Sequence, residues 1–270
     1  MKLSNAQYGM LAGLALVCSF GFACSKGAPP PAHAEHGEPG AHGDHGHHVH
    51  WGYAKDVGPG HWGDLEAEFA SCKTGQQQSP IDIAKASGQA VGPITFEYKK
   101  SGGTIVNNGH TIQVNVPPGS QVRMGGQTFP LAQFHFHAPS EHTVEGKAFP
   151  MEMHLVHKTA EGRIAVIGVL IESGSKNEAF EVIWNAMPSN PEEQKALGDN
   201  SLDPTALLPK DLTQYHYSGS LTTPPCSEGV DWSVIKTPIQ LSPEQIAKFK
   251  ALYPMNARPV QPVNSRKIDG

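Results

Sequence analysis

Residues 133–137, which read Gln-Phe-His-Phe-His, place two histidines one residue apart. Side chains of a β-strand alternate between its two faces, so on a strand the imidazoles of His135 and His137 point the same way. Two nitrogen ligands can then reach one metal ion. Phe134 and Phe136 would point to the opposite face, and we expect their burial there to hold the strand rigidly enough to fix metal geometry.

A third metal ligand is predicted in the strand-like stretch 152–157, which reads Glu-Met-His-Leu-Val-His. Glu152 and His154 share one face of this strand, whereas His157 points to the other face and is expected to be a packed structural histidine. Glu152 can orient His154, as carboxylates commonly do for metal-bound imidazoles. Three neutral nitrogen ligands leave the fourth tetrahedral position of zinc to water, the arrangement of catalytic zinc sites. We therefore predict Zn²⁺ as the cofactor, held by His135, His137 and His154.

The elements that must position these histidines are mostly strands. From residue 51 onward, short runs rich in Val, Ile, Phe and Thr alternate with Gly, Pro and Asn, which indicates strands joined by turns. Strands are expected at 104–106, 111–116, 132–137, 151–157 and 164–171. Helical periodicity is clearest at 177–186 and 243–252, the latter preceded by Ser242 as a candidate N-cap. The predicted fold class is mainly β (α+β), with short helices outside the sheet and no internal repeat.

Four sequence blocks, in family order along the chain, resemble the signatures of the α-class carbonic anhydrases. They are residues 133–137, Ser-Glu-His-Thr-Val at 140–144, Glu-x-His-Leu-Val-His at 152–157 and Ser-Leu-Thr-Thr-Pro-Pro-Cys at 220–226. The similarity extends from 50–53 to 256–262, about the whole chain after its first 48 residues. A single His-x-His is a weak signal, but agreement at so many ordered blocks makes the chain resemble a bacterial, exported member of this family.

This resemblance implies both a fold and a reaction. The fold is a single domain around a central twisted, mostly antiparallel ten-stranded sheet with short peripheral helices. The reaction is the reversible hydration of carbon dioxide to bicarbonate and a proton, by attack of zinc-bound hydroxide. Carbonic anhydrase is itself the standard example of this chemistry, in which zinc lowers the pKa of bound water to about 7. Activated esters are expected only as side substrates.

Three residues have catalytic roles by this resemblance. The Thr222 hydroxyl accepts a hydrogen bond from hydroxide and donates one to the Glu141 carboxylate, while the Thr222 backbone N–H polarises the substrate oxygen. His110 matches the proton shuttle of the family, and the ordinary histidine pKa near 6.5 suits that task. The plain alternatives are a surface charge on a loop for Glu141 and an exposed histidine without a role for His110.

The remaining site residues also follow from the resemblance. The apolar substrate pocket is lined by Val156, Val166, Leu221, Thr222, Thr223 and Trp232. The waters leading to His110 are held by Tyr53, Asn108 and Gln113. The zinc ligands are braced by Gln133, Glu152 and the backbone near Asn256. The apolar members of this set would also be ordinary core residues by sequence alone. The chain departs from the family pattern at Gln113, where Asn is frequent, and at Ala257, where Trp is frequent.

The N-terminus has the layout of an export signal over residues 1–24: a lysine near the start, an apolar run at 10–22 and small residues at the end. The apolar run is too short to span a bilayer comfortably. Cleavage before Cys24 would give a lipoprotein, and cleavage after Ala34 would give a soluble secreted protein. Both alternatives stay open. We expect export to the periplasm, with membrane attachment only through a lipid on Cys24.

Cys72 and Cys226 occupy, by the same resemblance, the positions of a disulfide found in bacterial and secreted members of the family. The disulfide would pin the loop that carries Thr222. Its loss is expected to lower activity and to reduce stability, by on the order of 4 kcal/mol from unfolded-chain entropy.

Residues 25–48 are rich in His, Gly and Pro and almost free of large apolar side chains, so we expect a disordered tether before a domain at 49–270. The histidines between residues 27 and 50 are His33, His36, His42, His45, His47, His48 and His50. They form either a site for zinc, copper or nickel or a solvated spacer, and the sequence leaves both readings open.

The net charge of the chain bears on the kind of partner that it binds. The chain of 270 residues carries a formal net charge of -5 and has a pI near 6.3, which gives no reason to expect nucleic acid. The expected partner is a small molecule, carbon dioxide or bicarbonate, and a homodimer rests on analogy alone. The rival interpretations are a catalytically silent member of the fold that acts as a binding module, a periplasmic zinc-binding protein that uses the tether, and a zinc esterase.

Overall fold

A computed structural model describes residues 49–84, 86 and 88–270 of the chain. The predicted export signal, Cys24 and the predicted tether lie outside these residues. Among the described helices, none is long and apolar enough to cross a membrane.

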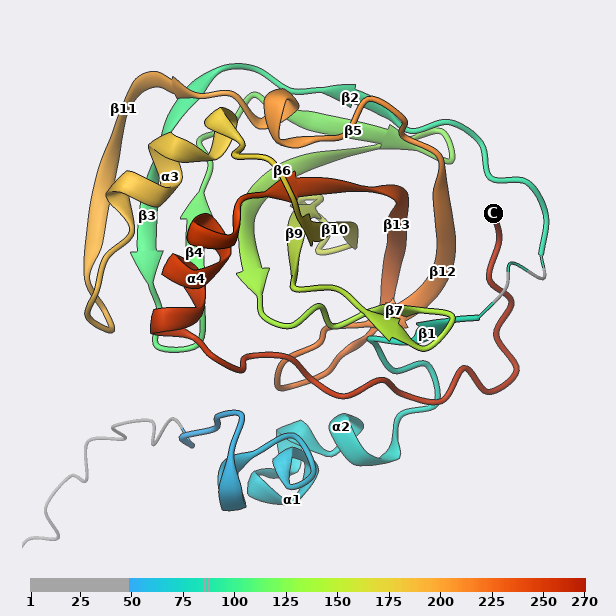
Figure 1. Cartoon of the computed structure of the whole chain (residues 1–270). Helices are drawn as coiled ribbons and strands as arrows, with labels where there is room; N and C mark the ends of the chain where they lie inside the picture. The colour runs from blue at the N-terminus through green and yellow to red at the C-terminus, as the bar shows by residue number, and fades with distance from the viewer. Residues whose placement is uncertain (1–48, 85, 87) are drawn as a thin grey trace, which may run out of the picture. The chain divides into compact units, whose positions relative to one another are not determined.

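One large twisted sheet dominates the domain (Figure 1). Its main path runs β11-β3-β4-β6-β9-β10-β13-β12, and β2 and β5 extend it beside β6 to give ten strands. The strands are β2 (Thr95–Glu97), β3 (Ser101–Asn107), β4 (Ile112–Asn115), β5 (Gln121–Met124), β6 (Gln127–His137), β9 (Met151–Lys158), β10 (Ile164–Ser173), β11 (Gln194–Leu202), β12 (Gln214–Ser220) and β13 (Glu228–Leu241). All pairs are antiparallel except β10 with β13. The predicted fold class and the ten-stranded, mostly antiparallel sheet are confirmed.

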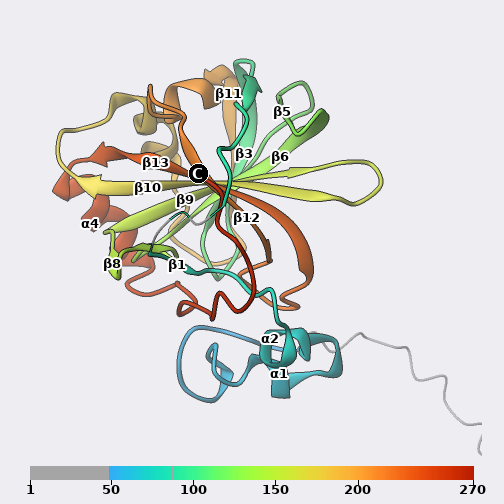
Figure 2. The same ribbon diagram turned by 90° about the vertical axis from the view of Figure 1, so that its right-hand side faces the viewer.

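A second, small sheet and short helices surround the large sheet. The small sheet has the order β1-β7-β8, with strands β1 (Asp82–Ile83), β7 (Thr143–Val144) and β8 (Lys147–Ala148). The described helices are η1 (Lys55–Val57), α1 (Trp62–Leu65), η2 (Ala67–Phe69), α2 (Ser71–Thr74), η3 (Glu178–Phe180), α3 (Glu181–Ala186), η4 (Pro204–Leu207) and α4 (Pro243–Leu252). Figure 2 shows α4 to one side of the fanned strands and α1 and α2 at their lower end.

The two helices predicted from periodicity are both present, although 177–186 divides into η3 and α3. Helix α4 begins as predicted, because the Ser242 side chain accepts from the Gln245 backbone N–H and the Gln245 side chain accepts from the Ser242 N–H. This reciprocal capping box satisfies two backbone donors that a helix start otherwise leaves unpaired.

Strand β9, which carries His154, is buried on both faces, and β6, which carries His135 and His137, is buried on the face of Phe134 and Phe136. Phe136 packs on one face of β6 against Phe180, Trp184 and Phe249, with ring centroids 5.1 to 6.2 Å apart. On the other side of the sheet, a second apolar cluster is centred on Trp232, which is 1% exposed. Strands packed in this way cannot shift without opening a cavity, so they make a rigid support for a metal site.

Candidate metal centre

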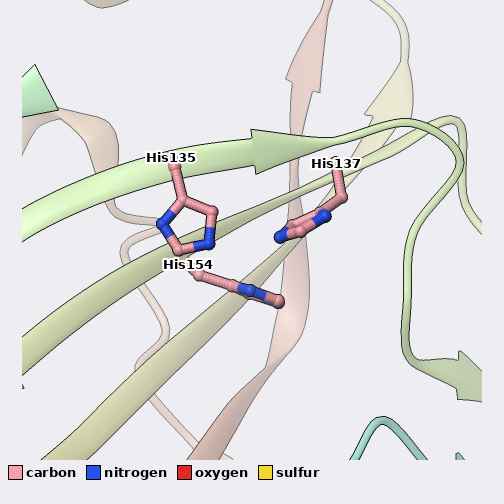
Figure 3. A group of neighbouring side chains, drawn as sticks. All are labelled: His135, His137 and His154. Atoms are coloured by element: carbon pink, nitrogen blue, oxygen red, sulfur yellow. The ribbon is translucent and has the colours of Figure 1, made fainter. Parts of the chain in front are cut away.

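The sheet brings His135, His137 and His154 together. His135 and His154 are directly paired across β6 and β9, and His137 follows two residues later on the same face of β6. One ring nitrogen from each histidine lies within 4.8 Å of those of the other two. Figure 3 shows the three rings converging from these two strands. His137 and His154 are each 1% exposed, whereas His135 is only half-buried and faces the open side of the site.

Each histidine uses one ring nitrogen in a hydrogen bond and leaves the other free for a ligand. His135 Nδ1 lies 2.8 Å from Gln133 Oε1, and His137 Nδ1 lies 2.7 Å from the Asn256 backbone oxygen. His154 Nε2 lies 2.9 Å from Glu152 Oε1. The nitrogens left to face one another are therefore Nε2 of His135, Nε2 of His137 and Nδ1 of His154.

The charge state of these imidazoles suits a metal. Burial lowers the pKa of His135 well below its usual range, lowers that of His137 to about 4, and lowers that of His154 as well. Neutral imidazole is the form that coordinates metal ions. His137 Nε2 is also fully buried without a hydrogen-bond partner among the described residues, and its lone pair is free to coordinate a cation. The donor set, its protonation and this orphaned nitrogen fit Zn²⁺ with three protein ligands.

Glu152 holds this arrangement from behind and is fully buried. Its Oε1 accepts a hydrogen bond from His154 Nε2 and also lies 2.7 Å from His142 Nδ1. Its Oε2 accepts hydrogen bonds from the backbone N–H groups of Glu141 and His142. The two neighbouring imidazoles hold the pKa of Glu152 well below its usual range despite burial. Gly168 faces this carboxylate, and an added Cβ there would lie 2.9 Å from Glu152 Oε1. A side chain at this position would therefore have to displace the buried Glu152 carboxylate.

Sequence reasoning gave no role to His142, although it stands within a recognised block. His142 Nε2 lies 2.7 Å from the Tyr217 hydroxyl, which lies 2.9 Å from Ser79 Oγ. A buried chain of hydrogen bonds thus runs from His154 through Glu152 and His142 to Tyr217 and Ser79. Spacing along the sequence carries no signal for this chain, because its members come from four separate segments.

Glu141 and Thr222 are both buried beside the histidines, at 1% and 6% exposed. Burial raises the pKa of Glu141 to about 7, while His154, the Arg258 N–H and the Thr222 hydroxyl each act to lower it. Glu141 Oε1 accepts from the Arg258 backbone N–H at 2.8 Å. Glu141 Oε2 is buried without a hydrogen-bond partner among the described residues. A cation at the three histidines would favour the ionised carboxylate.

His110 lies in the tight connection between β3 and β4. The Asn108 side chain accepts the backbone N–H groups of His110 and Thr111, which shapes this turn. The His110 ring stacks on Trp51, with centroids 3.7 Å apart and planes within 4°. Partial burial and the nearby His50 lower the pKa of His110, and Glu192 acts in the opposite direction.

The three polar residues predicted to hold waters near His110 are Gln113, Asn108 and Tyr53. Gln113 pairs directly with His135 across β4 and β6. Its side-chain oxygen lies 3.5 Å from Asn108 Nδ2, and its side-chain nitrogen donates to Asn115. Burial raises the pKa of Tyr53 well above its usual value, so its phenol stays protonated, and its hydroxyl has no partner among the described residues.

The residues predicted to line an apolar wall come mostly from neighbouring strands. Val156 pairs with Val166, and Val166 pairs with Trp232, so the three side chains lie in a row across β9, β10 and β13. The Trp232 ring is 4.9 Å from that of His154. Leu221 packs against the same cluster, whereas Val166 and Trp232 are so deeply buried that they also serve as core residues. Thr223 is half-buried in the loop beyond Thr222.

Cys72 and Cys226 form a disulfide, as predicted. It joins α2 to the loop after Thr222, across 154 residues of sequence. Asn256 is hydrogen-bonded to the strands and loops around the site. Its side-chain oxygen accepts a hydrogen bond from the Ala138 backbone N–H, and its side-chain nitrogen donates to the Phe136 and His110 backbone oxygens. Ala257 thus follows a firmly anchored residue.

Known proteins share this arrangement of sequence and fold. The family described as eukaryotic-type carbonic anhydrase matches residues 57–269. A carbonic anhydrase of Nostoc sp. is 46% identical over 225 residues, covering 82% of this chain and 85% of the relative. A carbonic anhydrase of Pectobacterium carotovorum is 43% identical over 221 residues, covering 82% of this chain and 90% of the relative.

A solved structure gives the same result for the fold. The α-carbonic anhydrase of Thermovibrio ammonificans, in complex with the inhibitor sulfanilamide, superposes with a TM-score of 0.80 at 47% identity. The match covers 82% of this chain and 99% of that one. The three histidines, Glu141 and Thr222 all lie within the matched region of the family.

Proposed function

Because the chain belongs to the α-carbonic anhydrase family and is a carbonic anhydrase, we propose that it hydrates carbon dioxide reversibly with Zn²⁺ at His135, His137 and His154. The observation that carries the proposal is the convergence of three neutral imidazoles whose second nitrogens are all engaged. Zinc bound there would lower the pKa of a water molecule and so supply hydroxide at neutral pH. The half-buried His135 leaves that side accessible to water and substrate.

Glu141 and Thr222 would orient the nucleophile. The Arg258 N–H fixes one oxygen of Glu141, which leaves the other to accept from the Thr222 hydroxyl once the carboxyl is ionised. Thr222 would then use its remaining lone pair to accept from the nucleophile and turn it toward the substrate. The Thr222 backbone N–H would polarise the substrate oxygen.

The apolar row of Val156, Val166 and Trp232 would receive the uncharged substrate, together with Leu221. Carbon dioxide offers only weak hydrogen-bond acceptors, so a small apolar recess beside the nucleophile favours it over larger esters. His110 would pass the released proton to the solvent through waters held near Asn108, Gln113 and Tyr53.

The test pairs two histidines of one strand. His154→Gln should lose zinc and bring carbon dioxide hydration, measured by stopped flow, to the level of the uncatalysed reaction. His157→Gln is the matched control, because His157 is equally buried on β9 but faces away and bonds to the Tyr98 hydroxyl. It should keep zinc and turnover. Zinc bound by the parent protein without turnover would instead indicate the silent binding module.

We also propose export of this enzyme to the periplasm, on the basis of the signal-like residues 1–24. The Cys72–Cys226 disulfide supports an oxidising compartment. Mass spectrometry of the mature N-terminus from fractionated cells tests this: a lipid-modified Cys24 supports the lipoprotein, and an unmodified shorter terminus supports the soluble form. Recovery of an intact Met1 in the cytoplasm would overturn export.

A further inference from the structure

A buried arginine links Glu141 to the distant disulfide. Arg258 is 2% exposed, and its backbone N–H donates to Glu141 Oε1. Its guanidinium donates through Nη1 to Gln78 Oε1 and the Ser79 carbonyl, at 2.9 and 2.7 Å, and through Nη2 to the Cys72 carbonyl at 2.9 Å. The planar fork of arginine presents several donors in fixed directions, which lysine cannot reproduce.

Gln78 completes the link to the other half of the disulfide. Gln78 is 3% exposed, and its Nε2 donates to the Cys226 carbonyl at 3.1 Å and to Glu228 Oε1 at 3.0 Å. Arg258 and Gln78 therefore hold the backbone carbonyls on both sides of the Cys72–Cys226 bond within one hydrogen-bonded unit. The charge of Arg258 persists at neutral pH, since burial lowers its pKa only to about 10.

The loop that carries Thr222 needs such support. Cys226 has a φ of +56°, in the left-handed region that disfavours residues other than glycine. The loop closes through hydrogen bonds from Leu221 N to the Ser227 carbonyl and from Cys226 N to the Thr223 carbonyl. A strained residue persists where its surroundings over-determine its conformation, and here the disulfide and the Gln78 bond do so.

We propose that Arg258 and Gln78 are positioning residues for the reaction, acting with the Cys72–Cys226 disulfide as one unit that sets Glu141 relative to Thr222. The inference rests on the proposed roles of those two residues. Arg258 holds Glu141 from its backbone and α2 from its side chain, and Gln78 joins that side chain to the loop. None of the three parts touches the substrate; they act by fixing distance, where an error of about 1 Å can cost on the order of 10²-fold in rate.

A double-mutant cycle tests this unit. Arg258→Lys keeps the charge but loses the fork, and Cys72→Ala with Cys226→Ala removes the disulfide. We expect each change to lower kcat/KM for carbon dioxide by about 10-fold or more, with KM changed much less than kcat. Combined, they should lower kcat/KM less than twofold beyond the larger single effect, because both break the same unit. Multiplication of the two separate effects would overturn the proposal.

Two further variants keep the test decisive. Gln78→Met matches the length of glutamine without its hydrogen bonds and should lower kcat/KM in the same non-additive way if Arg258→Lys does not fold. Arg266→Lys is the control, because the Arg266 guanidinium likewise donates to three acceptors, the backbone carbonyls of Ser218, Pro262 and Val263, without a hydrogen bond to Glu141 or to the backbone of Cys72 or Cys226. It should leave kcat/KM unchanged.

A readout independent of turnover is hydrogen exchange at the Cys226 and Arg258 backbone amides, followed with zinc removed. Exchange at both amides should speed up together in Gln78→Met and stay slow in Arg266→Lys. Zinc content separates the two levels of failure: a parent enzyme without zinc or turnover contradicts the proposed function. An active parent whose Arg258 and Gln78 variants keep full kcat/KM contradicts the positioning role alone.

Discussion

At the scale of single residues, hydrogen bonds decide which nitrogen of each imidazole is offered to a metal. Gln133 and the Asn256 carbonyl engage Nδ1 of His135 and His137, whereas Glu152 engages Nε2 of His154. Each ring is therefore fixed in both tautomer and orientation before any ion binds. By holding the rings in place, groups that hydrogen-bond to the ligand histidines increase metal affinity.

Replacement of Glu152 should weaken the metal site. In Glu152→Gln the His154 and His142 rings lose a shared anionic acceptor, so zinc affinity should fall about 10- to 100-fold. Competition with a chelator measures this affinity directly. Glu161→Gln, at an exposed surface position, is the control. Equal zinc affinity in both variants would show that Glu152 has no part in holding the metal.

Replacement of His110 should slow proton transfer and leave the metal site intact. In His110→Ala, kcat should fall by roughly 10- to 100-fold at low buffer concentration, because a general acid–base group is lost. A small imidazole buffer should restore part of the rate, while zinc content and kcat/KM stay near those of the parent. If kcat of His110→Ala equals that of the parent and does not change when imidazole buffer is added, His110 does not carry the proton.

At the scale of elements, the alternation of β6 joins the metal site to the core. Its histidines face the site, and Phe134 and Phe136 are fully buried on the opposite face. Phe136 contacts side chains of η3, α3 and α4, so the short helices outside the sheet support the ligand strand from behind. Stability and metal geometry should therefore change together.

Truncation of Phe136 should lower both the stability of the fold and the affinity for zinc. Phe136→Ala leaves a cavity under β6 and should reduce the free energy of unfolding by about 3 to 5 kcal/mol. Denaturant titration of the zinc-free protein measures this loss, and chelator competition should show weaker zinc binding. Met255→Ala, at a side chain that is 55% exposed, should change neither. If Phe136→Ala leaves zinc affinity unchanged, packing of the core behind β6 does not contribute to metal binding.

At the scale of the whole molecule, contacts between distant segments close the domain. The C-terminal residues pair with the sheet edge at His216 and Asp269, and Gln261 bridges to Ile81. His216 lies between two carboxylates, with Nε2 3.4 Å from Asp231 Oδ1 and Nδ1 3.8 Å from Asp269 Oδ2. Asp231 also pairs with Arg163. These pairs raise the pKa of His216.

A raised pKa makes this contact dependent on pH. The folded state binds the His216 proton more tightly, so the stabilisation is complete below the usual histidine pKa and is lost as pH rises through the raised value. Because the pair is partly exposed, it should contribute at most about 1 kcal/mol. His216→Gln should thus be less stable than the parent near pH 5.5 and equally stable near pH 9, by denaturant titration at each pH. A constant difference between the proteins across this range would contradict the linkage.

The sequence predicted the positions of some site residues better than it predicted their roles. The period of two placed His135 and His137 on one face of a strand and put His157 on the face away from His154, and the structure agrees. The strand positions, the capping of α4 by Ser242 and the disulfide were likewise predictable, the last from family resemblance. The roles of His110, Glu141 and Thr222 remain proposals.

By itself, the sequence determined which side chains share a face of each strand, because alternation is a property of the local backbone. It also determined the family, through ordered blocks of chemistry-bearing residues. Only the tertiary structure decided that Glu152 serves both His154 and His142, and that Arg258 joins Glu141 to Cys72. Such contacts join segments up to 186 residues apart. They depend on strand order and burial in three dimensions, for which spacing along the chain carries no signal.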